Sequence, residues 1–263
     1  MNKNILVIGG HKGIGLLISR YLIDKCKYNT ISTSSKKIDK RKKSYNKFNS
    51  FQIDLTKLKN LQNFFNFIKK RKISNFDTVI ISSGTLGTIG NFESSTIQDY
   101  KKTFQINLFG QIELCKFLLK KKLLRNNSNL IFLSTSLNIP DPFFIQYSAS
   151  KHAQYALMLS LSEELKNKKI FVNCLMPGQF HTEMNQRKIK SKKKISKKIF
   201  NQALKTKNIN DNNKIKNIEK TLDVLIQNNS VLKITGKIIS AQNDNLKKYN
   251  ISDKNCFSFI RKI

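Results

Sequence analysis

The sequence has no apolar run long enough to cross a membrane. Its longest apolar stretches, such as residues 5–8 and 79–81, fall far short of the about 18 to 20 residues that a bilayer-spanning helix needs. The amino terminus leads directly into a short apolar segment, without the apolar core and small-residue cleavage site of a secretory signal. We therefore expect no membrane association and a cytoplasmic location.

Cysteine is scarce as well. Cys26, Cys115, Cys174 and Cys256 are widely separated and form no Cys-x-x-Cys pair, which argues against a disulfide framework and against a zinc site. No pair among the three histidines has metal-ligand spacing, so each is expected to make local hydrogen bonds. We predict no metal site and reduced thiols.

Acidic residues and arginine are also few. The chain has 16 Asp and Glu against 49 Lys and Arg, a formal net charge of +33, and only six of the basic residues are Arg. Phosphate recognition usually depends on the bidentate arginine fork, and an A- and T-rich genome alone would impose an excess of Lys, Asn and Ile. The charge favours anionic ligands in general, and nucleic-acid binding is the less favoured interpretation.

What the sequence does contain is a regular alternation of strand and helix patterns. A chain of 263 residues, 39% of them hydrophobic, can bury a substantial core in one domain. The expected strands are residues 4–8, 28–33, 51–53, 77–81, 129–133, 170–174 and 231–240, and the expected helices are 14–22, 58–68, 97–124, 147–166 and 218–226. This alternation predicts an α/β fold of Rossmann type, a doubly wound parallel sheet with helices on both faces, in a single domain.

Four of the ten glycines lie in residues 9–15, where the first strand meets the first helix. Glycine at such a turn lets the backbone approach a pyrophosphate, whose charge is met by amides and by the positive end of the helix. The predicted dinucleotide contacts in this loop are Gly9, His11, Lys12, Gly13, Ile14 and Gly15.

The end of the second strand indicates which dinucleotide is bound. An acidic residue there would bond the ribose 2′-hydroxyl of NAD, but residues 32–37 offer hydroxyls and lysines, with no carboxylate before Asp39. Such groups suit a 2′-phosphate, with Ser34 and Lys12 as candidate contacts. We therefore predict NADP as the cofactor, with NADPH preferred over NADH.

Tyr147 and Lys151 lie four residues apart and so on one face of a helix. A phenol with a pKa of about 10 is a poor acid or base at neutral pH, and a nearby cation lowers that pKa. With seven Tyr and so many Lys, about one such pair is expected by chance. The pair alone therefore carries little weight.

In their order along the chain, these segments resemble the short-chain dehydrogenase/reductase family. The resemblance covers residues 3–183 and, loosely, the last strand. Its five motifs are Gly-x-x-x-Gly-x-Gly at 9–15, Asp-Leu at 54–55, Asn-x-x-Gly at 107–110, Tyr-x-Ala-Ser-Lys at 147–151 and Pro-Gly-x-x-x-Thr at 177–182. It implies an NADP(H)-dependent oxidoreductase that transfers hydride between nicotinamide and a carbonyl or secondary alcohol.

The resemblance also implies roles for individual residues. Tyr147 would supply the proton, and Lys151 would lower the pKa of Tyr147 and bond the nicotinamide ribose. Asn107 would carry the proton line to solvent, the alternative being that it bonds the backbone. The catalytic hydroxyl is Ser134, thirteen residues before Tyr147, or Thr135, which matches the strand end. The further cofactor contacts are Asp54, Leu55, Ser83, Gly84, Tyr147, Lys151, Pro177, Gly178, Phe180 and Thr182.

Two regions depart from a plain match. The family's Asn-Asn-Ala-Gly reads Ile-Ser-Ser-Gly at 81–84, so cofactor contacts there are expected to be looser. Residues 187–198 hold eight basic residues where the family has its substrate lid, and we expect a mobile, partly helical flap. The domain thus divides into a core over 1–183, a lid and following helix over 184–228, and a last strand and tail over 229–263.

The substrate stays open. A general carbonyl reductase, a 3-oxoacyl-acyl-carrier-protein reductase that docks an acidic carrier, and an enzyme of sugar or surface-polysaccharide metabolism all fit the resemblance. A basic-surface RNA-binding or dinucleotide-sensing protein is the non-enzymatic alternative. A homodimer or homotetramer is expected through the long helices, with an apolar face of Phe104, Leu108, Leu114 and Phe117.

Overall fold

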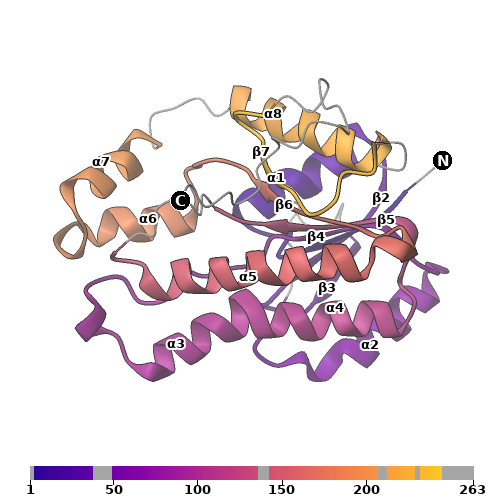
Figure 1. Cartoon of the computed structure of the whole chain (residues 1–263), viewed down its shortest axis with the longest axis horizontal. Coiled ribbons are helices and arrows are strands. Elements are labelled where there is room, and N and C mark those ends of the chain that lie inside the picture. The colour runs from indigo at the N-terminus through magenta and orange to yellow at the C-terminus, as the bar shows by residue number, and fades with distance from the viewer. Residues whose placement is uncertain (1–2, 38–48, 136–141, 207–211, 229–231, 245–263) are drawn as a thin grey trace.

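A parallel sheet lies at the centre of the molecule (Figure 1). The computed structural model describes residues 3–37, 49–135, 142–206, 212–228 and 232–244. Within these residues the strands are β1 (Asn4–Ile8), β2 (Asn29–Ser34), β3 (Asn49–Gln52), β4 (Phe76–Ile81), β5 (Leu124–Leu133), β6 (Phe171–Met176) and β7 (Ile238–Ser240). They are ordered β3-β2-β1-β4-β5-β6-β7, and every pairing is parallel. The predicted fold class is confirmed.

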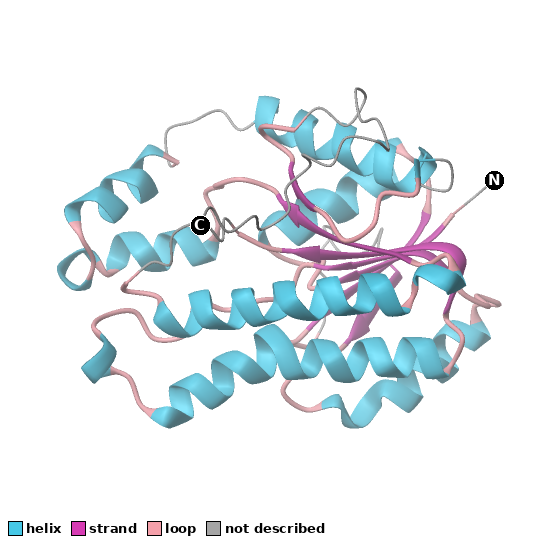
Figure 2. Ribbon diagram, in the orientation of Figure 1, coloured by secondary structure: helices cyan, strands magenta, loops and turns pink. Residues whose placement is uncertain are grey.

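Helices cover both faces of this sheet (Figure 2). On one face lie α1 (Gly13–Arg20) and α8 (Asn212–Asp223), and on the other α2 (Leu61–Lys70), α4 (Gly110–Lys120) and α5 (Ile145–Glu164), with α3 (Ile97–Phe104) packed against α5. The remaining two helices, α6 (Glu183–Lys190) and α7 (Lys197–Lys205), lie beyond one end of the sheet. The shorter turns are η1 (Tyr21–Lys25), η3 (Leu58–Asn60), η4 (Phe92–Ser94), η5 (Gln105–Phe109), η6 (Lys166–Lys168), η7 (Lys192–Lys194) and η8 (Val224–Asn228).

The alternation of side chains along β1 produces two cores. Successive strand residues point to opposite faces of a sheet, so Leu6 and Ile8 join the apolar cluster under α2, α4 and α5, whereas Ile5 and Val7 join the cluster under α1 and α8. All four side chains are buried. A continuous apolar strand is thus what a sheet covered on both faces requires.

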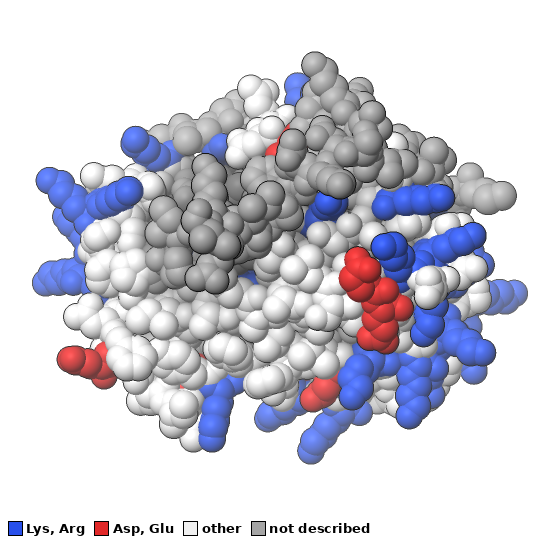
Figure 3. Space-filling view, in the orientation of Figure 1, with Lys and Arg blue, Asp and Glu red and all other residues white. Residues whose placement is uncertain are grey.

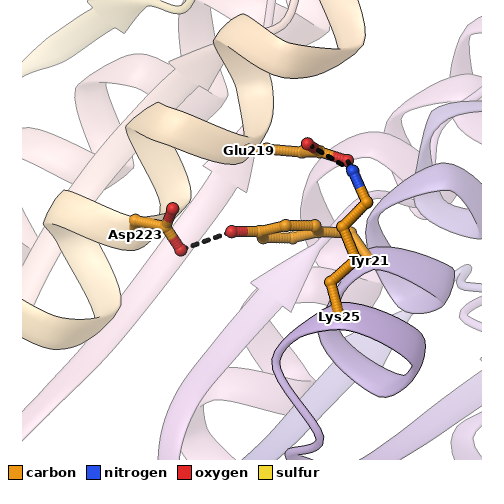
Figure 4. A network of polar contacts seen from close by, with 4 residues as sticks. All are labelled: Tyr21, Lys25, Glu219 and Asp223. Carbon is orange, nitrogen blue, oxygen red and sulfur yellow. Dashed lines mark hydrogen bonds and ion pairs between the residues drawn. The ribbon is translucent and has the colours of Figure 1, made fainter.

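Polar contacts connect η1 to α8 (Figure 4). The Tyr21 hydroxyl donates a hydrogen bond to the Asp223 carboxylate, and Lys25 Nζ lies 2.8 Å from both carboxylate oxygens of Glu219. Burial, followed by the bond to Asp223, raises the pKa of the Tyr21 hydroxyl. Since Lys25 is largely exposed, its pair stabilises the fold by about 0–1 kcal/mol.

The expected long helix over residues 97–124 ends earlier, at Lys120. The wider turn η5 joins α3 to α4 without a break, since the residues at both junctions keep helical φ and ψ. Lys122 then adopts a left-handed φ of +53°, and β5 begins at Leu124, five residues earlier than expected. In the predicted oligomer face, Leu108 and Leu114 are buried within the chain itself, so these two residues belong to the core.

The basic segment after residue 183 is more helical than expected. It forms α6, η7 and α7, because the hydroxyls of Thr182 and Ser196 cap the two α-helices by accepting from the Asn185 and Ile199 amides at 3.3 Å. The last strand is shorter than expected and spans only Ile238–Ser240. The predicted start of that strand, Val231, lies outside the described residues. Across the described ranges, no helix combines the length and apolar character that crossing a bilayer requires.

Candidate active site

The carboxyl ends of β1, β2, β4 and β5 open into one cavity of about 660 Å³. A crevice is expected there, because the strand order reverses between β1 and β4. The predicted site residues that line the cavity are Gly9, His11, Lys12, Gly13, Ile14, Ser34, Asp54, Leu55, Ser83, Gly84, Ser134, Tyr147, Lys151, Pro177 and Thr182. The predicted site residues that do not line it are Gly15, Asn107, Thr135, Gly178 and Phe180.

The glycine loop has the geometry of a phosphate cradle. Gly9 and Gly13 have φ values of +79° and +52°, the left-handed region that favours glycine. A Cβ on Gly15 would lie 2.3 Å from the Gly9 carbonyl oxygen, so Gly15 lets α1 pack against the loop. The first turn of α1 carries no acidic residue, which leaves its positive end to meet an anion. Burial lowers the pKa of His11 below its usual value, which keeps its imidazole neutral at neutral pH.

Hydroxyls and cations lie at the β2 end of the cavity. Ser34, Ser35 and Lys36 line it there, and Lys12 lines it from the glycine loop. Asp54 also lines it, but one of its carboxylate oxygens accepts from the Thr56 amide at 2.9 Å and from the Thr56 hydroxyl at 2.7 Å. These donors suit a phosphate-bearing ribose better than a bare 2′-hydroxyl.

Lys12 faces a partner across the cavity. Its Nζ lies 2.8 Å from a carboxylate oxygen of Glu183, the first residue of α6, and both side chains are exposed. This ion pair joins the glycine loop to the start of the basic helices. No local sequence pattern predicts this contact of Glu183, because its partner Lys12 lies 171 residues away.

Lys151 is buried and held by neutral acceptors. Its side chain is 3% exposed, and Nζ donates to the Leu133 carbonyl oxygen at 2.9 Å and to Gln154 Oε1 at 3.0 Å. Burial lowers the pKa of Lys151 to about 8. This cation lies 6.0 Å from the centroid of the Tyr147 ring.

The expected lowering of the Tyr147 pKa is not found. Burial raises the pKa of Tyr147 to about 12, and a hydrogen bond with Thr135 acts in the opposite, weaker direction. The expectation was wrong in direction because burial outweighs the stabilisation of the phenolate. Tyr147 therefore stays protonated across the neutral range.

The structure distinguishes the two candidate hydroxyls. Thr135 hydrogen-bonds the Tyr147 hydroxyl. Ser134, one residue earlier, lines the cavity, and its buried Oγ, near the Cys174 thiol on β6, has no hydrogen-bond partner among the described residues. Thr135 thus lies beside the phenol, whereas Ser134 faces the cavity.

Asn107 lies in η5 and is fully buried. Its Oδ1 accepts from the Thr85 amide at 2.8 Å, and its Nδ2 donates to the Thr85 carbonyl oxygen and to Ser150 Oγ, each at 2.9 Å. The backbone-bonding alternative therefore describes its contacts in this structure. Its place in a proton line stays a prediction.

Two buried glutamines that the sequence analysis did not single out extend the hydrogen bonds around Lys151. Gln154 Nε2 donates to Gln111 Oε1 at 2.5 Å, and Gln111 Nε2 donates to the Ser83 carbonyl oxygen at 3.2 Å. Both glutamines are 0% exposed. They connect Lys151 to the loop after β4, where hydroxyls replace the family's asparagines. Gln154 could have been noticed, because it lies one turn after Lys151, whereas Gln111 comes from another helix.

Among the described residues, no three His, Cys, Asp or Glu side chains are grouped so that they could hold a metal ion.

Residues 3–193 match the family model described as short chain dehydrogenase. The chain belongs to this family. Its members are nicotinamide-dependent oxidoreductases that act on alcohols and carbonyls, and the resemblance found in the sequence is confirmed.

Individual relatives agree with this placement. The Drosophila melanogaster protein named dehydrogenase/reductase SDR family protein 7-like is 32% identical over 108 residues, 41% of this chain and 33% of that protein. The match thus spans a third of that relative's length. A short chain dehydrogenase from Salmonella enterica superposes with a TM-score of 0.73 at 21% identity, covering 92% of this chain and 96% of that one. ElxO with NADP bound gives a TM-score of 0.70 at 23% identity over 92% and 97% of the two chains. The two structures show a shared fold.

Proposed function

We propose that the chain is an NADPH-preferring reductase that transfers a hydride to a carbonyl carbon. The observation that carries this proposal is one cavity with two chemical ends. At one end lie the glycine loop and the serines and lysine after β2, which suit a phosphorylated dinucleotide. At the other lie Tyr147 and Lys151, beside Thr135.

Three side chains would handle the developing charge. A bound nicotinamide cofactor supplies the hydride. Tyr147, which is protonated at neutral pH, donates its proton to the carbonyl oxygen, while Thr135 holds the phenol in place by its hydrogen bond. Lys151 places a positive charge beside this oxygen. These groups stabilise the transition state more than the ground state, because the oxygen gains charge as the hydride arrives.

Lys151 also has a donor left for the cofactor. An ammonium carries three donors, and two of them are used by Leu133 and Gln154. Since Lys151 lines the cavity, the third can bond a ribose hydroxyl. The neutral acceptors thus fix the ammonium without adding a negative charge to the site.

A fluorescence titration with NADPH and NADH, at low and physiological salt, tests the proposal. We expect both to bind, with NADPH tighter by about tenfold, since a 2′-phosphate gains charge-assisted hydrogen bonds from Lys36 and the nearby serines. Failure of both cofactors to bind would remove the proposed function. Tighter binding of NADH would remove the preference for NADPH.

The basic residues that the sequence offers for docking an acidic carrier protein lie far from the cavity. Lys120–Lys122 and Arg125 lie before or at the start of β5, and Lys168 and Lys169 lie before β6, whereas the cavity lies at the carboxyl ends of these strands. The ten residues of β5 separate the two by about 30 Å. A sugar stays an alternative substrate. The residues beside the cavity determine which substrate charge the site favours.

A further inference from the structure

A second cavity of about 500 Å³ adjoins the first. The two share Thr85, Lys102 and Arg187. We call the second cavity the outer pocket, and define it by its lining residues: Thr85, Gly87, Thr88, Ile89, Asp99, Lys102, Thr103, Arg187, Lys190, Ser191 and Lys194. None of the residues after β2 that would hold the adenosine end is among them. The outer pocket therefore extends the site on the substrate side.

Cations from separate elements converge on the outer pocket. Lys102 comes from α3, Arg187 and Lys190 from α6, and Lys194 from η7. Figure 3 shows basic side chains at the end of the molecule where α6 and α7 lie, and a larger number of them at the opposite end. In the described part of the chain, Lys190 and Lys194 form no ion pair.

The acidic residue of the outer pocket is already engaged. The Asp99 carboxylate accepts from the Thr96 amide and hydroxyl, each at 2.9 Å, in the capping box that begins α3. These bonds hold the pKa of Asp99 below its usual value. With four cations against this one carboxylate, the lining is strongly positive.

Hydrogen bonds hold the part of the loop after β4 that lines the outer pocket. Buried Gln146 accepts from the Thr88 amide at 2.9 Å, and Arg187 Nη2 donates to the Gly87 carbonyl oxygen at 2.7 Å. Gly87 has a φ of +70°, and a Cβ there would lie 2.2 Å from Gln146 Oε1. The loop after β4 is therefore a firm support that sets the position of the guanidinium.

We propose that the outer pocket binds an anionic group, a carboxylate or a phosphate, carried by the carbonyl substrate whose oxygen meets Tyr147. This inference rests on the proposed function and names its substrate class. Arg187 provides a planar fork suited to either oxyanion, and the three lysines add point charges. The positive charge of the α6–η7 segment would thereby select substrates that carry an anionic group.

The test compares two pairs of ketones that differ in charge: levulinate with methyl levulinate, and dihydroxyacetone phosphate with dihydroxyacetone. At saturating NADPH, kcat/KM for an anionic member is expected to exceed that of its neutral partner by about tenfold at low salt, and the ratio falls as salt screens the exposed lysines. The pair with the larger ratio distinguishes a carboxylate from a phosphate.

Variants assign this ratio to the outer pocket. Lys190→Gln and Lys194→Gln should each lower it about two- to fivefold and leave NADPH affinity unchanged, since neither residue lines the cofactor cavity. Lys193→Gln is the matched control, because Lys193 lies in the same turn but does not line the outer pocket. Equal ratios in the wild type and in the Lys190 and Lys194 variants would overturn the proposal.

A direct binding measurement keeps the test independent of turnover. The four ketones are titrated by calorimetry into the enzyme saturated with NADP⁺. Tighter binding of the anionic members supports the outer pocket, and equal binding overturns it. Failure of the cofactor itself to bind overturns the proposed function instead.

Discussion

The active-site region contains two groups of cations that are built in opposite ways. Lys151 is buried and meets only uncharged acceptors, the Leu133 carbonyl and the Gln154 amide. In the outer pocket, Lys190 and Lys194 are exposed and have no acceptor of their own in the described residues. One arrangement fixes a single charge at a single position, and the other creates a positive field over an open surface.

The difference determines how each group responds to change. A buried cation has a shifted pKa and depends on each hydrogen bond, because an unpaired polar group in the interior is costly. Exposed cations act additively, are screened by salt, and each contributes little. Substitutions in the buried network should therefore have large effects that do not depend on salt, and substitutions in the outer pocket should have small, salt-dependent ones.

Tyr147→Phe should have the largest effect. Removing the proton donor should lower kcat by about 10²–10⁴-fold, while the dissociation constant of NADPH stays near that of the wild type. Tyr100→Phe is the matched control, because the Tyr100 hydroxyl makes no hydrogen bond in the described part of the chain. Full activity in the Tyr147 variant would rule out the assigned acid.

Thr135→Val should come next. Loss of the hydroxyl beside Tyr147 should reduce kcat by about 10²-fold, measured with the best ketone of the panel. Ser134→Ala is the comparison, and we expect a smaller change, since Ser134 lines the cavity but its Oγ bonds neither Tyr147 nor any other described residue. The reverse order of effects would make Ser134 the catalytic hydroxyl.

The pH profile of reduction should report the buried lysine. The pKa of Lys151 is lowered to about 8 and that of Tyr147 is raised to about 12, so kcat/KM should fall as pH rises through about 8 and Lys151 loses its charge. Gln154→Leu should move this alkaline limb to lower pH, and Gln154→Glu should move it to higher pH. The other titratable group near the ammonium, Cys174, is buried with a raised pKa and stays a neutral thiol in this range.

Gln154→Leu should also destabilise the fold. The change leaves the Lys151 ammonium and the Gln111 amide each short of one partner, at a cost of about 1–3 kcal/mol in the free energy of unfolding. Urea denaturation measures it, with Gln62→Leu on the exposed face of α2 as the control. Equal stability of the two variants would show that the network does not hold Lys151.

Lys36→Gln should have the smallest effect. Lys36 lines the β2 end of the cavity, and its loss should reduce the preference for NADPH over NADH about two- to fivefold, without changing NADH affinity. Lys37→Gln, at the neighbouring position outside the cavity lining, is the control. An unchanged ratio of the two dissociation constants would move the phosphate contact elsewhere.

The fold and most of the residues that line the cavity could be predicted, because each signal was local. Strand and helix periodicity, the glycine loop and the step from Tyr147 to Lys151 lie within one turn or one element. The rest could not, because it depends on contacts between distant segments. Gln111 meets Gln154 across 43 residues, and Arg187 meets Gly87 across 100. The direction of the Tyr147 pKa shift depends on burial, which a spacing of four residues does not reveal.

Transfer of deuterium tests the central claim most directly. The enzyme is incubated with the ketone panel and NADPH deuterated at the transferable position, and the product alcohols are analysed by mass spectrometry. Deuterium at the carbinol carbon of the alcohol, formed by the wild type and lost in Tyr147→Phe, is the predicted result. Binding of NADPH with no transfer to any ketone would contradict the account, and would favour a protein that senses the dinucleotide without reacting with it.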